Sequence, residues 1–153
     1  MPDTISIRPA GEGDVETIAH FNMALCREVE GRELDPPTVI EGVRRFVMEP
    51  SRGRYFVAES AGSVIAQAAY TFEWSDWRNG EIWWFQSVYV HADFRAKGVF
   101  RSLFEHIRDL GRKDPDCCGV RLYMERHNET ARKAYRKLGF REAGYEVLEL
   151  LFR

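Results

Sequence analysis

Residues 82–102 read IWWFQSVYVHADFRAKGVFRS, and this stretch predicts a strand, a loop and a helix in succession. Residues 82–90 form an almost unbroken run of aromatic and β-branched side chains, which is typical of a central strand covered on both faces. A helix is expected after Gly98, because apolar residues then recur at helical spacing, at Phe100, Leu103, Phe104, Ile107 and Leu110. The junction over residues 88–102 is therefore the first candidate for a binding site.

The beginning of that helix has the features of an anion site. Backbone N–H groups in the first turn of a helix have no intrahelical partner, and together with the helix dipole they suit a pyrophosphate. Gly98 lets the backbone approach a ligand closely because it has no Cβ, and Arg95, Lys97 and Arg101 add positive charge. Taken alone, the segment also fits an ordinary glycine-bearing loop. It is not a Walker A loop, since no GxxxxGK(S/T) is present.

The segments on either side predict a mixed α/β sheet. Before the central strand we expect a strand at residues 5–8, a helix from residue 11 or 14 to residue 30, a helix between residues 35 and 50, and a hairpin of residues 55–59 and 64–72. A polar, Trp-bearing loop is expected over residues 73–80. The helix that begins after Gly98 is expected to end before Pro115. Beyond it we expect a strand at 119–124, a short helix at 128–138, and two strands near 141–145 and 147–152.

A second feature lies at residues 128–140, which read NETARKAYRKLGF. Asn128 can cap a helix, and Tyr135 lies on the same helix face as Ala131 and Leu138. By themselves these residues fit a capped helix with a core aromatic.

In this order and context, the two features resemble the GNAT superfamily of acetyltransferases. Residues 87–98 are similar to its acetyl-CoA-binding motif, residues 128–140 to its second cofactor motif, and the opening ISIRPA at residues 5–10, with Asp14, to its usual start. The resemblance covers nearly the whole chain. It implies one domain over residues 1–153, with a mixed, largely antiparallel sheet of about six or seven strands flanked by about four helices.

The resemblance also implies residue roles. Backbone groups of Val88 and Val90 would bind the pantetheine arm, the loop amides would hold the pyrophosphate with help from Ser102, and Asn128 would lie near the thioester. Tyr135 would be the catalytic acid that protonates the departing sulfur, since a phenol is neutral at pH 7 and can donate. The residues assigned in this way to acetyl-CoA are Val88, Tyr89, Val90, Arg95, Ala96, Lys97, Gly98, Val99, Phe100, Arg101, Ser102 and Asn128.

Two departures from the family pattern matter. Phe100 stands where Gly or Ala is common, so its side chain must point away from the phosphates. Gln86 stands where many members have a Glu as general base, and an amide cannot take a proton at neutral pH. A water relay, another carboxylate or an amine that arrives neutral would then serve. The side chains considered as bases are Glu73, Asp76, Glu81 and Glu125. His91 and His127 are possible as well, but a lone His is more often a surface residue, and neither is assigned to the site.

The acceptor is expected to be a primary amine of a small molecule. Alternation places Trp83, Phe85 and Tyr89 on one face of the central strand, and Trp84 with Gln86 on the other. Some of these aromatics are core residues, and the others, with Trp74 and Trp77, could wall a pocket for a cationic amine. Residues 70–80 also resemble, weakly, the matching region of diamine and polyamine acetyltransferases.

Composition bounds the remaining partners. The 153 residues carry 22 basic and 24 acidic side chains, for a formal net charge of −2, which argues against a chain-wide nucleic-acid surface. No segment approaches the ~20 apolar residues that cross a bilayer, and residues 1–4 do not begin a signal peptide. Three cysteines without a His cluster predict neither a disulfide framework nor a metal site. We expect a cytoplasmic protein.

Two alternative functions stay open at this point. Gln86 favours a non-catalytic acyl-CoA-binding or sensor module. The Arg132-Lys133 and Arg136-Lys137 pairs would suit nucleic acid, although helical spacing favours a solvated face. We expect a homodimer, to which the apolar C-terminal segment at residues 147–152 could contribute an edge strand.

Overall fold

The computed structural model describes residues 4–153, and Met1–Asp3, where no signal peptide is expected, lie outside that range. Its backbone divides into two compact units, Met1–Tyr123 and Met124–Arg153. The expectation of a single domain stays a prediction. Among residues 4–153, none of the helices combines the length and the apolar character that a membrane crossing requires.

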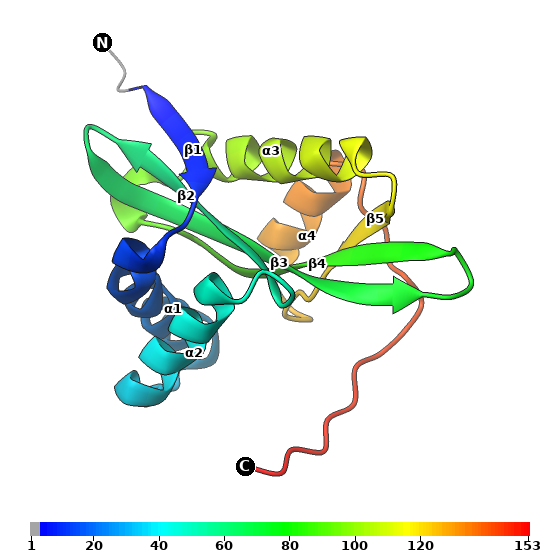
Figure 1. The fold of residues 1–153 in the computed structure, drawn as a ribbon, viewed down its shortest axis with the longest axis horizontal. Helices are drawn as coiled ribbons and strands as arrows, with labels where there is room; N and C mark the ends of the chain where they lie inside the picture. Colours follow the sequence, from blue (N-terminus) through cyan, green and yellow to red (C-terminus); the bar gives the residue numbers. More distant parts are fainter. Residues whose placement is uncertain (1–3) are drawn as a thin grey trace. The chain divides into compact units, whose positions relative to one another are not determined.

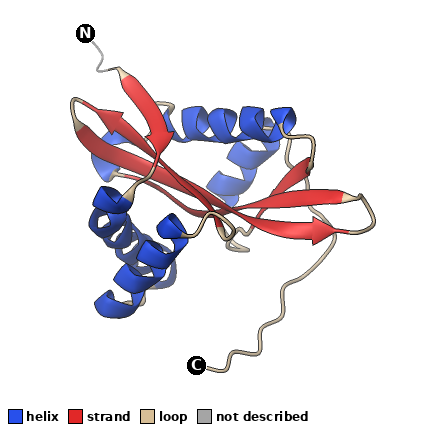
Figure 2. Ribbon diagram, viewed as in Figure 1, coloured by secondary structure: helices blue, strands red, loops and turns tan. Residues whose placement is uncertain are grey.

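The first unit is built on a five-stranded sheet in the order β1-β2-β3-β4-β5 (Figures 1 and 2). The strands are β1 (Ile5–Pro9), β2 (Gly53–Ser60), β3 (Ser63–Ser75), β4 (Gly80–Val90) and β5 (Cys117–Leu122). Neighbours from β1 to β4 are antiparallel, whereas β5 runs parallel to β4. A parallel pair needs a long crossover, and α3 (Val99–Lys113) supplies it.

Helices cover both faces of this sheet (Figure 1). The helices α1 (Val15–Glu30) and α2 (Pro36–Met48) pack on one face, where Val15, Ile18 and Val43 meet Tyr55 and Val57 of β2. On the other face, α3 packs through ring contacts, at 5.6 Å between Phe104 and Phe85 and 5.3 Å between His106 and Phe56. Asp35 caps α2 by accepting from the Thr38 N–H at 3.2 Å.

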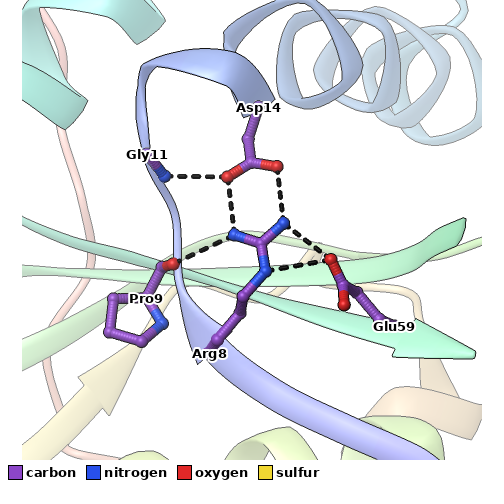
Figure 3. Close-up of polar contacts among 5 residues, drawn as sticks. All are labelled: Arg8, Pro9, Gly11, Asp14 and Glu59. Atoms are coloured by element: carbon purple, nitrogen blue, oxygen red, sulfur yellow. Dashed lines mark hydrogen bonds and ion pairs between the residues drawn. The ribbon is translucent and has the colours of Figure 1, made fainter. Parts of the chain in front are cut away.

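An arginine on β1 ties three elements together (Figure 3). Arg8 donates to both carboxylate oxygens of Asp14, at 2.8 and 2.9 Å, and to Glu59 of β2 at 2.7 and 2.9 Å. Asp14 also accepts from the Gly11 N–H at 2.7 Å. It ends a short 3-10 turn, η1 (Glu12–Asp14), just before α1. Arg8 therefore fixes where α1 leaves the sheet.

The second unit contains α4 (Glu129–Lys137) and an extended C-terminal segment. The two final strands expected near residues 141–145 and 147–152 are absent, because residues 138–153 form neither helix nor strand. Leu148 and Phe152 are 91% and 93% exposed. A strand needs a hydrogen-bonded neighbour, and an apolar pattern alone does not supply one. The α/β fold with four helices and a mixed sheet is thus confirmed, with five strands.

The hairpin of β3 and β4 is longer than expected. Residues 73–75 and 80 were predicted to be loop, but Glu73 pairs with Ile82 and Trp74 with Glu81 in the antiparallel ladder. Only residues 76–79 form the turn. The polar pattern of the segment hid the strand, because its side chains are mostly exposed and the pairing stabilises the backbone.

Candidate functional site

The candidate site begins at an irregularity in β4. In the ladder with β3, Gln67 pairs with Tyr89 and Ala69 with Gln86, so Ser87 and Val88 together lie opposite Ala68. This two-against-one arrangement is a β-bulge, and Ser87 has a φ of 50°, in the left-handed region. On the other side, β5 pairs with β4 only over Glu81–Phe85 in register. Within residues 4–153, β4 from Gln86 to Val90 therefore has no strand on that edge.

The backbone at this open edge includes two of the predicted cofactor residues. The N–H of His91 donates to Ile65 of β3, at 2.8 Å. Successive residues of a strand direct their backbone groups to alternate edges, so Val88 and Val90 direct theirs away from β3. The carbonyl of Val90 accepts from Arg95 Nε at 2.9 Å. The geometry suits a ligand with amide groups that lies along β4.

The bulge corrects one expectation about side chains. Trp83 and Phe85 do lie on the α3 face, but Tyr89 packs on the opposite face, with its ring 5.1 Å from Phe21 of α1. One inserted residue reverses the alternation beyond it. Simple period-two counting along the strand missed this reversal.

The loop that follows contains two left-handed residues, Ala96 and Gly98, with φ of 61° and 80°. It passes through the 3-10 turn η2 (Ala92–Phe94), and Gly98 is the residue before α3. A Cβ placed on Gly98 would meet no atom within 4 Å. No other atom fills the position beside Gly98, and the N–H groups in the first turn of α3 have no intrahelical partner, which suits an anion.

The predicted cations around the loop differ in their partners. Arg95 donates to both oxygens of Glu28 on α1, at 3.0 and 3.1 Å, and lies 5.3 Å from the Tyr89 ring centre. The Glu28 carboxylate raises the pKa of Arg95 further above its usual value. Arg101 pairs with Glu105 at 2.8 Å. Lys97 has its ammonium 5.6 Å from the Phe94 ring centre.

Phe100 and Ser102 turn their side chains to the helix itself. The Phe100 ring lies 6.4 Å from that of Phe104, on the apolar face of α3, as the expected orientation away from the phosphates requires. The hydroxyl of Ser102 donates to the carbonyl of Gly98 at 3.1 Å, one turn back. A role of Ser102 at a phosphate would need that hydroxyl to rotate.

In the second unit, Asn128 and Tyr135 belong to the same helix. Asn128 caps α4, since its side-chain oxygen accepts from the Ala131 N–H at 3.0 Å. The Tyr135 ring lies 5.6 Å from Phe140, and burial raises the pKa of its phenol. Arg132 and Arg136 both donate to Glu142, which lowers the pKa of that carboxyl to about 2. Part of the basic pattern of α4 is thus neutralised locally.

Comparison with known proteins identifies the family. A family model described as an acetyltransferase (GNAT) domain matches residues 51–142, which include the β4 edge, the loop and α4. This chain belongs to the GNAT acetyltransferases. The match agrees with the resemblance that residues 87–98 and 128–140 suggested, and it makes the protein a GNAT-type acetyltransferase by family.

Solved structures agree with that assignment. A possible acetyltransferase from Clostridium difficile is 42% identical, with a TM-score of 0.91 over 97% of this chain and 98% of that one. A predicted acetyltransferase with acetyl-CoA, from Clostridium acetobutylicum, is 18% identical, with a TM-score of 0.78 over 97% and 96%. A ribosomal-protein-alanine N-acetyltransferase from Brucella melitensis is 16% identical, with a TM-score of 0.76 over 98% and 100%. The last two share the fold. No curated protein matches the chain.

On this GNAT acetyltransferase, the carboxylates considered as general bases differ in their partners. Asp76 accepts from the Trp77 N–H at 3.0 Å, and Glu125 accepts from the His127 N–H at 2.8 Å. Gln86 donates from Nε2 to the Thr71 hydroxyl at 3.2 Å. Glu73 pairs with Arg121 of β5 at 3.0 Å. Arg121 in turn lies 6.0 Å from the Trp84 ring centre, and Trp84 stacks on Tyr123 at 4.4 Å. Glu73 is thus already bound to a cation.

The aromatic side chains considered for an acceptor pocket differ in their burial. Trp83 and Phe85 are buried core residues, and Trp74 and Trp77 are 59% and 85% exposed near the end of the hairpin. Trp84 and Tyr123 remain as a stacked pair on the face of the sheet opposite α3. Trp84 lies two residues before Gln86 on β4, so the two side chains share that face.

Proposed function

We propose that this GNAT acetyltransferase moves the acetyl group of acetyl-CoA onto the primary amine of a small molecule, by direct attack in a ternary complex. The observation that carries the proposal is the edge of β4 at Val88 and Val90 that β5 leaves unpaired, followed along the chain by the Gly98 loop and the first turn of α3. Backbone donors in this order suit the amides and the pyrophosphate of one elongated molecule. The Clostridium acetobutylicum protein, which shares the fold, was obtained with acetyl-CoA.

In the reaction, the amine nitrogen attacks the thioester carbonyl carbon, a C–N bond forms and the C–S bond breaks. The electron pair of that bond goes to sulfur, which takes the proton of the Tyr135 phenol. The new amide nitrogen loses its proton to water, and water returns a proton to the Tyr135 phenolate. A raised pKa keeps Tyr135 protonated at neutral pH, as an acid must be. We propose Asn128 as a contact near the thioester.

We further propose that the amine arrives uncharged or loses its proton through water. Gln86 cannot accept a proton, and its amide donates to Thr71. Glu73 is paired with Arg121. Diamines and polyamines are the first acceptors to test, because aromatic faces such as the Trp84–Tyr123 pair attract ammonium groups.

A panel of amines tests the function. Each amine is incubated with acetyl-CoA and the protein, free thiol is followed, and the product mass is measured. We expect one class of primary amine to gain a single acetyl group. If acetyl-CoA binds and no amine in a broad panel is acetylated, the second candidate, a non-catalytic acyl-CoA sensor, is favoured. Gln86 and its bond to Thr71 are the observation behind that candidate.

We also propose that the protein is a cytoplasmic homodimer that binds no nucleic acid. The apolar C-terminal side chains support the dimer, since Tyr145, Leu148, Leu150, Leu151 and Phe152 are all exposed. One chain has a mass of 17.8 kDa, and sedimentation at micromolar concentration should give twice that mass. A monomeric mass would remove the dimer without affecting the acetyl transfer.

A further inference from the structure

A polar side chain lies in the core behind the bulge of β4. Gln67 of β3 is 0% exposed, and its Nε2 donates to the Ser87 carbonyl at 3.0 Å and to Asn22 Oδ1 of α1 at 2.7 Å. Asn22 Nδ2 donates in turn to the Tyr55 hydroxyl of β2, at 3.1 Å. We call Gln67, Asn22 and Tyr55 the bulge anchor. It connects α1, β2 and β3 to one carbonyl of β4.

Stability alone does not account for this glutamine. Burying an amide is unfavourable unless all of its hydrogen-bonding groups find partners. Gln67 Oε1 is buried and has no hydrogen-bond partner within the described residues. An apolar side chain of similar size would avoid that penalty, so the amide is better explained by what its two N–H groups hold.

What they hold is a strained turn of the strand. Ser87 has a φ of 50°, a region that disfavours residues with a Cβ. The extra residue of a bulge drops out of the ladder, and the Gln67 amide gives its carbonyl a donor. The same bulge moves Tyr89 against Phe21 and turns Val88 and Val90 toward the open edge. Ser87 thus sets the direction of the backbone that follows.

We infer that Gln67, itself oriented by Asn22, is a positioning residue for the acyl donor. It fixes the Ser87 carbonyl and thereby the direction in which the Val88 and Val90 backbone meets the pantetheine arm. The inference rests on the proposed use of acetyl-CoA, and it assigns to Gln67 no contact with the substrate.

The test compares Gln67→Leu with Val57→Ala. Val57 is the cross-strand neighbour of Gln67 in β2, is equally buried and lies outside the anchor, so its truncation measures lost packing alone. Asn22→Ala, at a half-buried position, is the second variant and serves if Gln67→Leu does not fold. The measurements are acetyl-CoA affinity by calorimetry, the KM for each substrate, and amide hydrogen exchange along β4.

We expect Gln67→Leu to weaken acetyl-CoA binding about tenfold, equivalent to about 1.4 kcal/mol, and to raise the KM for acetyl-CoA and not that for the amine. The Tyr89 and His91 amides of Gln67→Leu, which face β3, should exchange faster than those of Val57→Ala at equal stability. Unchanged affinity and exchange in both anchor variants would overturn the inference and leave the proposed function standing. A wild type that binds no acetyl-CoA would overturn the proposed function, and the exchange data would still decide whether Gln67 holds the bulge.

Discussion

Arg95 Nη2 donates to both carboxylate oxygens of Glu28, at 3.0 and 3.1 Å, and this ion pair connects the loop before α3 to α1. Arg95 also donates to the Val90 carbonyl, so one side chain joins α1, the end of β4 and the loop. The sequence suggested that Arg95 adds positive charge for a phosphate. The structure shows that its charge is matched by Glu28 and that its contacts hold the loop in shape.

Arg95→Lys should therefore weaken acetyl-CoA binding several-fold although the charge is kept. Lysine cannot reproduce the planar fork that reaches Glu28 and Val90 together. Arg101→Lys is the matched control, because Arg101 pairs with Glu105 one turn along its own helix. Calorimetry compares the two. Equal losses in both variants would mean that charge, and not loop geometry, determines the affinity.

Ala96→Gly should stabilise the protein by up to about 1 kcal/mol. Ala96 has a φ of 61°, and a Cβ is unfavourable in that region. Ala92→Gly, in the 3-10 turn of the same loop, gives the control, since Ala92 is not a positive-φ residue and its replacement should lower stability. Urea unfolding measures both changes. A loss of stability in Ala96→Gly would refute the strain at this position.

Tyr135→Phe should lower kcat by about 100-fold or more and leave the affinity for acetyl-CoA almost unchanged. Burial raises the pKa of Tyr135, so the phenol stays protonated, and able to donate, at all pH values below its ordinary pKa of about 10. The alkaline limb of the kcat profile should lie above that value in the wild type and be absent in the variant. A wild-type rate in Tyr135→Phe with the true acceptor would remove this residue from the mechanism.

Asp14→Asn should lower the free energy of unfolding by about 1–2 kcal/mol at neutral pH, in the lower part of the range for charged hydrogen bonds because Arg8 is 40% exposed. Arg8 holds the pKa of Asp14 below its usual value. The contribution of the Asp14 carboxylate to the free energy of unfolding is therefore complete above the pKa of Asp14 in the unfolded chain, about 3.9. It is lost as the pH falls through the lower pKa of Asp14 in the folded protein.

Urea unfolding of wild type and Asp14→Asn at pH 7 and near pH 3 tests that linkage. The difference in the free energy of unfolding between the two proteins should be smaller at the lower pH. Asp109→Asn, at an exposed pair with Arg108, should change little at either pH. If the difference in unfolding free energy were the same at both pH values, the ion pair with Arg8 would not be its source.

Local patterns predicted the parts of the site that depend on local sequence. The helix start at Gly98, the capping role of Asn128 and the fold class all follow from spacing and residue type over short stretches. The bulge at Ser87 does not, because it depends on the pairing of β4 with β3 and on a side chain 20 residues away. A lone Gln67 in an apolar strand carries no signal by itself. The error over Tyr89 has the same origin.

The C-terminal segment shows the opposite error. Residues 147–152 have the composition of a strand, and the prediction of one there was wrong for this structure. β-propensity reflects how well a side chain fits a half-buried sheet, and a segment without a paired neighbour gains nothing from it. The sequence also predicted too short a β3. Glu73 and Trp74 are exposed, so their pattern does not indicate a strand, but both are paired with β4.

Calorimetric titration of acetyl-CoA into the wild type, Gly98→Asp and Gly62→Asp tests the central claim most directly. The two glycines have nearly the same φ, 80° and 79°, and a Cβ on either meets no atom within 4 Å, so the backbone strain is matched. Only Gly98 lies at the start of α3, where an added carboxylate would repel the pyrophosphate. We predict that the wild type and Gly62→Asp bind and that Gly98→Asp does not. Equal binding by all three proteins, or none by the wild type, would contradict the proposed acetyl-CoA site.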